Sequence, residues 1–144
     1  MSVTERTLVR YAGPEDLEWC VVEDGAVTEQ AVRHKIANDE IIIAEIDGQP
    51  VGYIRLEYLL STKPYIGLIF VDDAYRGEGI GRKMLRFLED HLKKYGYEEI
   101  YTSSKVSEPE PQAWYRANSF VECGLINGIN EGNIGEIFFR KSLV

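Results

Sequence analysis

A strand, a glycine-rich loop, a long helix and a second strand follow one another in the middle of the chain, and this segment constrains the fold most. Tyr65–Val71 is mostly apolar, as expected of a strand. In Ile80–Tyr95, apolar residues recur at spacings of three and four, which indicates an amphipathic helix. Gly96 is expected as its left-handed C-terminal cap. With a strand at Glu99–Ser104, this order predicts a crossover that joins two parallel strands.

Shorter elements alternate through the rest of the chain. The continuously apolar Ile41-Ile42-Ile43 is typical of a strand covered on both faces, and Asp47-Gly48 is a hairpin signal. Ser107 and Glu110 have the spacing of a capping box that starts the last helix. Further strands are expected at Thr4–Tyr11, Glu40–Ile46, Val51–Leu59, Phe120–Ile126 and Ile134–Arg140, with helices starting near Pro14 and Thr28. The whole predicts an α/β fold with a mixed sheet.

Length and charge exclude several classes of protein. The 144 residues suit a single domain spanning residues 1–144. With 16 Lys and Arg against 24 Asp and Glu, the net charge is −8, which argues against nucleic-acid binding and against docking on an anionic membrane. No apolar run is long enough to span a bilayer, so we expect a cytoplasmic protein. The only cysteines, Cys20 and Cys123, are expected to be buried thiols and not a disulfide.

The loop between the central strand and helix has the composition of an anion site. Its glycines allow a sharp turn whose N–H groups, together with those of the helix N-terminus, face one way. The spacing fits neither the dinucleotide fingerprint nor the P-loop. It fits Arg-x-x-Gly-x-Gly, at Arg76, Gly79 and Gly81. The simpler alternative is a tight turn with a helix cap, for which one or two glycines would suffice.

This loop resembles the pyrophosphate loop of the GCN5-related N-acetyltransferases (GNAT family), which bind acetyl-coenzyme A. Ala113–Phe120 is similar to the second motif of the family, a helix that carries a Tyr and ends in Gly-Phe. Here Ser119 stands in place of that Gly. The strand order also fits, so the resemblance covers nearly the whole chain. It implies the acyl-CoA N-acyltransferase fold, a mostly antiparallel sheet with a central parallel strand pair.

The resemblance also implies the residues that bind acetyl-CoA, and it implies no metal. The backbone of Ile69, Phe70 and Val71 would pair with the pantetheine arm. Lys83 could add charge near the phosphates. The pyrophosphate would be held by Arg76, Gly77, Glu78, Gly79, Ile80, Gly81 and Arg82.

Two residues are candidates for proton transfer. Tyr115 matches the family position that contacts the coenzyme A sulfur and protonates the leaving thiolate, although Trp114 and Tyr115 could instead only pack the helix against the sheet. The central strand contains no carboxylate, so Glu57 is the candidate base, acting through water. The alternative for Glu57 is a surface ion pair with Arg55.

The resemblance implies an N-acetyltransferase that transfers acetyl directly to a primary amine of a small molecule or peptide. The acidic charge mildly favours a cationic acceptor. A different class stays open, a non-catalytic acyl-CoA sensor or assembly module on the same fold. Exposed strand edges make a homodimer plausible.

Overall fold

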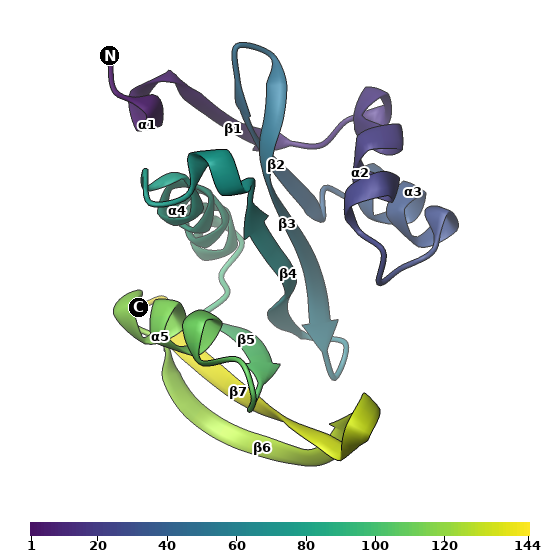
Figure 1. Cartoon of the computed structure of the whole chain (residues 1–144), viewed down its shortest axis with the longest axis vertical. Coiled ribbons are helices and arrows are strands. Elements are labelled where there is room, and N and C mark those ends of the chain that lie inside the picture. The colour runs from purple at the N-terminus through teal and green to yellow at the C-terminus, as the bar shows by residue number, and fades with distance from the viewer. The chain divides into compact units, whose positions relative to one another are not determined.

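The computed structural model describes residues 1–144 and alternates helices with strands along most of the chain (Figure 1). The helices are α1 (Val3–Arg6), α2 (Leu17–Glu23), α3 (Glu29–Ala37), α4 (Ile80–Lys94) and α5 (Pro109–Ala117), with single turns η1 (Pro14–Asp16), η2 (Asp73–Tyr75) and η3 (Glu131–Asn133). The strands are β1 (Thr7–Tyr11), β2 (Ile41–Ile46), β3 (Gln49–Leu59), β4 (Lys63–Val71), β5 (Glu99–Lys105), β6 (Val121–Asn130) and β7 (Ile134–Ser142).

Hydrogen bonds join the strands into a seven-stranded sheet in the order β1-β2-β3-β4-β5-β7-β6. The pairs β1–β2, β2–β3, β5–β7 and β6–β7 are antiparallel. The β4–β5 pair is parallel, with Tyr65 opposite Tyr101. Since α4 connects these two strands, the predicted crossover and the predicted mixed sheet are confirmed.

The chain packs as two units, one formed by residues 1–56 and 68–88, the other by residues 57–67 and 89–144. In the first unit, Ile41 and Ile43 join Tyr53 in a core that α2 and α3 complete. The opposite face of the same strands packs against α4. Gly52 of β3 lies so close to Met84 of α4 that a Cβ at Gly52 would be only 3.0 Å from the Met84 sulfur. Both faces of β2 are therefore covered, which explains its uninterrupted isoleucines.

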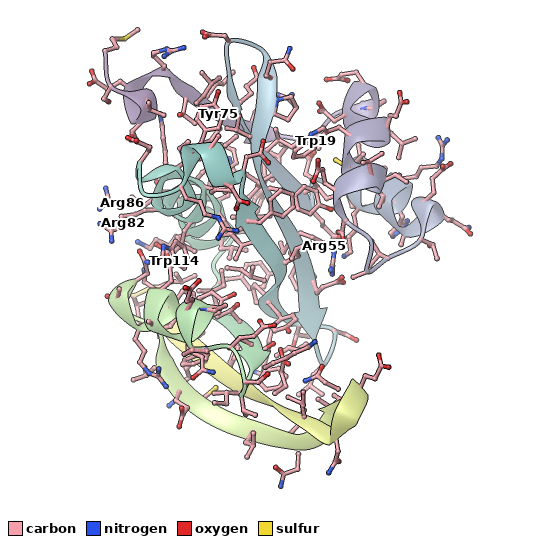
Figure 2. The ribbon with its side chains drawn as sticks, viewed as in Figure 1. Trp19, Arg55, Tyr75, Arg82, Arg86 and Trp114 are labelled. Atoms are coloured by element: carbon pink, nitrogen blue, oxygen red, sulfur yellow. The ribbon has the colours of Figure 1, made fainter.

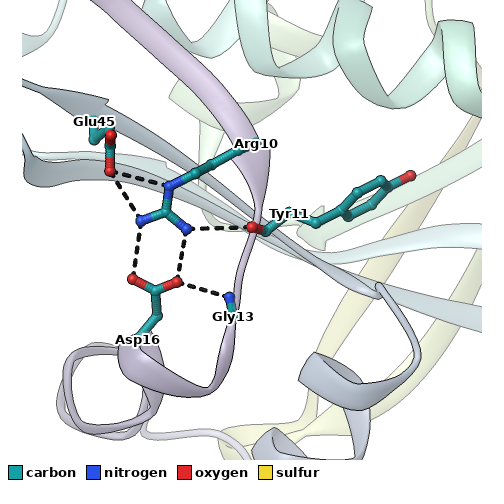
Figure 3. Close-up of polar contacts among 5 residues, drawn as sticks. All are labelled: Arg10, Tyr11, Gly13, Asp16 and Glu45. Carbon is teal, nitrogen blue, oxygen red and sulfur yellow. Dashed lines mark hydrogen bonds and ion pairs between the residues drawn. The ribbon is translucent and has the colours of Figure 1, made fainter.

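Arg10 ties the start of α2 to the edge of the sheet (Figure 3). Its guanidinium donates to both carboxylate oxygens of Asp16, at 2.7 and 3.0 Å, and to Glu45 at 2.9 Å. Asp16 also accepts from the Gly13 N–H at 2.8 Å. The Arg10 hydrogen bonds, more than any other contact, hold the pKa of Asp16 below its ordinary value.

In the second unit, α5 packs on the β5–β7 layer through Tyr115. The Tyr115 ring lies 5.7 Å from the rings of both Phe120 and Phe139. The hairpin β6–β7 is longer than expected, because residues 127–130, which follow the predicted strand Phe120–Ile126, also belong to β6 and are joined to β7 by the single turn η3. Most of β6 is exposed, including its large apolar residues Val121, Leu125, Ile126 and Ile129.

Two predicted helix and strand starts are wrong. The predicted first strand begins only at Thr7, because Ser2 and Glu5 form a capping box that starts α1. The capping box predicted at Ser107 does not form. Glu108 is the N-cap of α5 and its side chain makes no capping hydrogen bond. Gln112 instead donates to the carbonyls of residues 105 and 106, at 3.0 and 3.3 Å.

Smaller corrections concern exposure and strand length. Tyr95, predicted on the apolar stripe of α4, is 75% exposed. Cys123 is exposed, whereas Cys20 is buried as predicted, and both are free thiols. Strand β4 starts at Lys63, two residues before the predicted start. None of the helices combines the length and apolar character that crossing a membrane would require.

Candidate functional site

The glycine loop between β4 and α4 has the backbone conformation that its sequence predicts. Gly77 and Gly79 have φ angles of +78° and +85°, in the left-handed region that residues with a Cβ rarely adopt. Gly81 lies within the first turn of α4 and needs no such conformation. Two of the three glycines are therefore required by backbone geometry alone.

The N-terminus of α4 supplies backbone donors at this loop. The N–H of Lys83 donates to the carbonyl of Gly79 at 3.1 Å, which closes the first helical turn. The N–H groups of Ile80 and Gly81 come before that bond and have no carbonyl within the helix to bind. A helix start of this kind favours an anion through its donors and its dipole.

The N-terminal segment anchors the loop from outside. The Thr4 hydroxyl donates to the carbonyl of Glu78, and a Cβ on Gly79 would lie 3.4 Å from the Thr4 hydroxyl oxygen. The ammonium of Lys83 donates to the carbonyls of Thr4 and Thr7, at 2.9 and 2.5 Å. Lys83 therefore holds α1 and β1 against the loop, a role that the sequence does not indicate.

The arginines of the loop are exposed. The Arg76 guanidinium lies 3.1 Å from the Asp73 carboxylate and donates to the carbonyl of Val71 at 3.3 Å, which links the two ends of η2. Arg82 and Arg86 project from the same side of α4 (Figure 2). Cationic side chains and backbone donors thus occur together at the start of this helix.

Aromatic side chains hold the end of β4. Phe70 stacks on Tyr53 with ring centroids 5.4 Å apart, and Trp19 of α2 lies 6.2 Å from Phe70 (Figure 2 labels Trp19). These contacts fix the strand segment Ile69–Val71, whose backbone is the predicted pantetheine partner. Rings at these separations contribute about 0.5–1.5 kcal/mol beyond their buried area.

Next to this aromatic group lies a buried carboxylate, Asp24, that no sequence motif marks. Asp24 is 1% exposed, and one of its oxygens accepts from the Tyr53 hydroxyl and from Arg55 Nε, both at 2.7 Å. Burial, and next the bond to Asp24, raise the pKa of Tyr53 above its ordinary value. Asp24 therefore fixes the α2–α3 connection onto β3.

The two predicted proton-transfer residues belong to the second unit. Glu57 is half-buried near the end of β3. Tyr115 is 6% exposed, and burial raises the pKa of its hydroxyl, with Thr102 acting in the opposite direction. The predicted binding residues 69–71 and 76–82 belong to the first unit.

Sequence reasoning also missed a hydrogen-bonded group in the second unit, formed by Tyr65, Ser103 and Glu136. Each residue comes from a different strand, and no motif marks them. Only the pairing of β4, β5 and β7 brings them together. No group of three or more His, Cys, Asp or Glu side chains is arranged to hold a metal ion.

With this geometry established, comparisons with known proteins identify the family. Residues 10–120 match the Acetyltransferase (GNAT) family. Over 85 residues the chain is 34% identical to N-alpha-acetyltransferase RimI of Mycobacterium tuberculosis, covering 57% of this chain and 52% of that protein. It is 28% identical over 116 residues to streptothricin acetyltransferase of Streptomyces lavendulae, covering 79% and 58%.

The chain thus spans about half the length of these two curated relatives. The solved structure of YncA from Salmonella typhimurium, determined with its cofactor acetyl-CoA, has a TM-score of 0.76 and 16% identity to this chain. The match covers 96% of this chain and 95% of that one, which shows a shared fold. Since the family match covers most of the sequence, the chain belongs to the GNAT acetyltransferase family.

Proposed function

We propose that this protein transfers the acetyl group of acetyl-CoA directly to a primary amine. The observation that carries the proposal is the glycine loop, with Gly77 and Gly79 in left-handed conformations immediately before the N-terminus of α4. Membership of the GNAT family and the acetyl-CoA in the YncA structure support it.

The residues of the loop suit a pyrophosphate. Backbone donors of residues 77–82 would bind its oxygens, and Arg76 and Arg82 would supply positive charge within an acidic chain. The carbonyl oxygen of Glu78 accepts a hydrogen bond from the Thr4 hydroxyl, so this oxygen points towards Thr4. The backbone of Ile69–Val71 would bind the pantetheine arm, and an N–H near Phe70 or Val71 would polarise the thioester carbonyl.

Acetyl-CoA supplies an activated acyl group. Side chains of the protein would remove a proton from the amine and donate one to the leaving sulfur. An amine with a pKa of ~10.4 must lose its proton, which costs roughly 4–5 kcal/mol at pH 7. Glu57 is the base predicted from the sequence. Tyr115 is proposed to donate its hydroxyl proton to the leaving sulfur. Its hydroxyl carries a proton at neutral pH, as a tyrosine does, and the raised pKa makes it a weaker acid than an ordinary tyrosine.

The acceptor is proposed to carry a primary amine, and a cationic molecule is favoured by the net charge of −8. The two relatives are named for different acceptors, an Nα amine and streptothricin. A panel of acceptors should therefore contain an alanine-starting peptide, Nα-acetyl-lysine, spermidine and an aminoglycoside.

The test measures thiol release from acetyl-CoA with this panel, and acetyl-CoA affinity by calorimetry. Gly77→Ala and Gly48→Ala form a matched pair, because both glycines have φ near +80° and an added Cβ would meet nothing within 4 Å. We expect Gly77→Ala to weaken acetyl-CoA binding at least ~10-fold, through the altered backbone donors. Gly48→Ala, in the β2–β3 turn, should change stability only. Equal affinities in both variants would contradict the proposed loop.

Tyr115→Phe tests the proposed acid and should lower the rate of acetyl transfer about 100-fold without weakening acetyl-CoA binding more than a few-fold. Acetyl-CoA binding without thiol release on any amine would instead favour the acyl-CoA sensor. A single domain over residues 1–144, a homodimer, a cytoplasmic location and the absence of nucleic-acid binding stay predictions from the sequence.

A further inference from the structure

A chain of hydrogen bonds links three strands of the second unit. The Tyr65 hydroxyl lies 2.5 Å from the Ser103 hydroxyl, and Ser103 donates to one oxygen of Glu136 at 2.6 Å. The side-chain amide of Asn130 donates to the other Glu136 oxygen at 2.9 Å. Both partners of the carboxylate are neutral.

The direction of this chain follows from counting hydrogens. Ser103 has one hydroxyl hydrogen, and Glu136 as a carboxylate can only accept, so that hydrogen points to Glu136. The Ser103 oxygen therefore accepts from the Tyr65 hydroxyl. The chain runs in one direction, from Tyr65 through Ser103 to Glu136, and a proton can pass along it by successive transfers.

The rings packed beside this chain and beside Tyr115 lie on opposite faces of the β5–β7 pair, although Tyr65 and Glu136 also raise the pKa of the Tyr115 hydroxyl electrostatically. Ser103 is opposite Phe138 and Thr102 is opposite Phe139 in the antiparallel β5–β7 pair. Because neighbouring residues of a strand point to opposite faces, the two Phe rings lie on opposite faces of the sheet. The Tyr65 ring stacks on Phe138, at 5.9 Å, whereas Tyr115 packs on Phe139.

The two faces also differ in exposure. On the Tyr115 side, Thr102 is fully buried and Ser104 is 6% exposed. On the other side, Tyr65, Ser103 and Glu136 are each half-buried. Tyr65, Ser103 and Glu136 therefore keep more contact with solvent than Thr102 and Ser104 do. Direct transfer needs separate groups for two protons, because one proton leaves the attacking nitrogen and a different proton joins the departing sulfur.

We propose that Glu136 is the proton acceptor of the acetyl transfer, reached from the acceptor amine through Tyr65 and Ser103. The ammonium gives one proton to the Tyr65 oxygen while the Tyr65 proton moves to Ser103 and the Ser103 proton moves to Glu136. The nitrogen uses the freed electron pair to form the C–N bond, the C–S bond breaks, and the departing sulfur takes the Tyr115 proton. The nitrogen loses its second proton to water as the amide forms, and Tyr115 regains a proton from water. Glu136 later releases its proton to water.

This inference rests on the proposed acetyltransferase function and replaces Glu57 as its base. Tyr65 is the catalytic group, because it would touch the amine, and Ser103 and Glu136 act through it. The groups that face Glu136 are Ser103 and Lys105 of β5, Asn130 of β6 and Tyr65 of β4, with Lys105 directly opposite in the register. The titratable groups of α5 and its N-cap are Glu108, Glu110, Tyr115 and Arg116, and Glu136 acts electrostatically on Tyr115.

The experiment compares Glu136→Gln with Glu131→Gln, which removes the same charge from the exposed turn of the same hairpin. Rates are measured with an acceptor from the panel across pH 6–10, together with acetyl-CoA affinity. We expect Glu136→Gln to lower kcat/KM for the amine about 100-fold at pH 7, and its deficit to shrink as pH rises towards the pKa of the amine. Affinity for acetyl-CoA should stay within two-fold of the parent value. Glu131→Gln should follow the parent throughout.

Ser103→Ala removes a single oxygen atom and should fold normally. It therefore tests the proton path without a large change in stability. It should lose activity to a similar extent and with the same recovery at high pH, and Ser103→Thr should restore part of the rate. A pH-independent deficit in Glu136→Gln would indicate a structural role and overturn the inference. So would a normal rate in Glu136→Gln with a large loss in Glu57→Gln. If the parent protein acetylates no amine, the proposed function fails, and this inference fails with it.

Discussion

Asp24 and Glu136 both accept a hydrogen bond from a tyrosine or serine hydroxyl, but they differ in burial and in their other hydrogen-bond partners. Asp24, in the first unit, is 1% exposed and also binds the cationic Arg55. Glu136, in the second unit, is half-buried and has only neutral hydrogen-bond partners, Ser103 and Asn130. Both clusters could be taken for proton relays from their residue types alone.

The difference indicates which cluster supports the fold and which can move a proton. The buried Asp24 balances the charge of the buried Arg55 guanidinium, and removing it would leave that cation without its partner. The half-buried Glu136 is hydrogen-bonded to no cation, so no buried cation depends on it. We therefore assign Asp24 to stability and Glu136 to the reaction.

The largest expected effect is on stability, from Asp24→Asn. The variant keeps a hydrogen-bond acceptor but removes the negative charge beside Arg55 and Tyr53. Removing one partner of a buried ion pair typically costs about 3–5 kcal/mol. Urea unfolding measures the loss. Glu29→Gln is the control, since its pair with Arg33 is exposed and should contribute under ~1 kcal/mol.

A loss below ~1 kcal/mol in Asp24→Asn would remove the contrast between the two carboxylates. So would a change in the pH dependence of acetyl transfer, because Asp24 would then take part in proton transfer as well.

The second prediction concerns Ser103 and Glu136 together. If they belong to one proton path, then Ser103→Ala and Glu136→Gln each break it completely. The double variant should therefore lose no more of kcat/KM than either single variant, about 100-fold. A double-mutant cycle on kcat/KM measures this coupling. Multiplicative losses would mean that the two residues act independently, and the relay would have to be abandoned.

Much of the fold could be predicted because its signals are local. The apolar repeat of α4, the Asp47-Gly48 turn and the β4–α4–β5 crossover each depend on residues close in sequence. The glycine loop was predictable for the same reason, since left-handed φ angles at Gly77 and Gly79 follow from the loop itself.

Contacts between distant residues could not be predicted. Lys83 suggested a phosphate ligand, yet it binds the carbonyls of Thr4 and Thr7, more than seventy residues away. No local pattern marks Asp24, whose partner Tyr53 lies 29 residues further along the chain. The relay from Tyr65 to Glu136 depends on strand register, which a single sequence does not specify.

The third prediction uses pH, with Asp16 as a carboxylate that shares features of both clusters. It is buried like Asp24, yet its Arg10 partner is partly exposed. Arg10 lowers the pKa of Asp16, so the pair stabilises the fold above the ordinary Asp pKa of ~3.9, and the contribution is lost as pH falls through the lowered pKa.

Asp16→Asn should therefore be less stable than the parent by about 1.5–3 kcal/mol at pH 6, and the difference should shrink as the pH falls below the ordinary Asp pKa. Urea midpoints measured from pH 2 to 6 provide the test. A difference that stays constant over this range would show that the ion pair does not titrate, and that the substituted amide side chain merely packs less well.

The smallest effect is expected at Ser119, where the sequence departs from the family motif. Ser119 has φ of +72° at the end of α5, and the N–H of Phe120 donates to the carbonyl of Tyr115 across this turn at 3.0 Å. Gly96 holds the same position after α4, with φ of +87°. A left-handed conformation costs a residue with a Cβ about 1–2 kcal/mol, and a Gly at this position avoids that cost. Gly also makes the unfolded chain more flexible, which offsets part of the stabilisation.

Ser119→Gly should then stabilise the fold by about 0.5–1 kcal/mol, and Gly96→Ser should destabilise it by a similar amount. Because the backbone of the turn is unchanged, Ser119→Gly should leave Tyr115 in place and the rate of acetyl transfer within two-fold. A thermal melt and the thiol-release assay check the two expectations together. A large rate change would mean that strain at Ser119 helps to position the proposed acid.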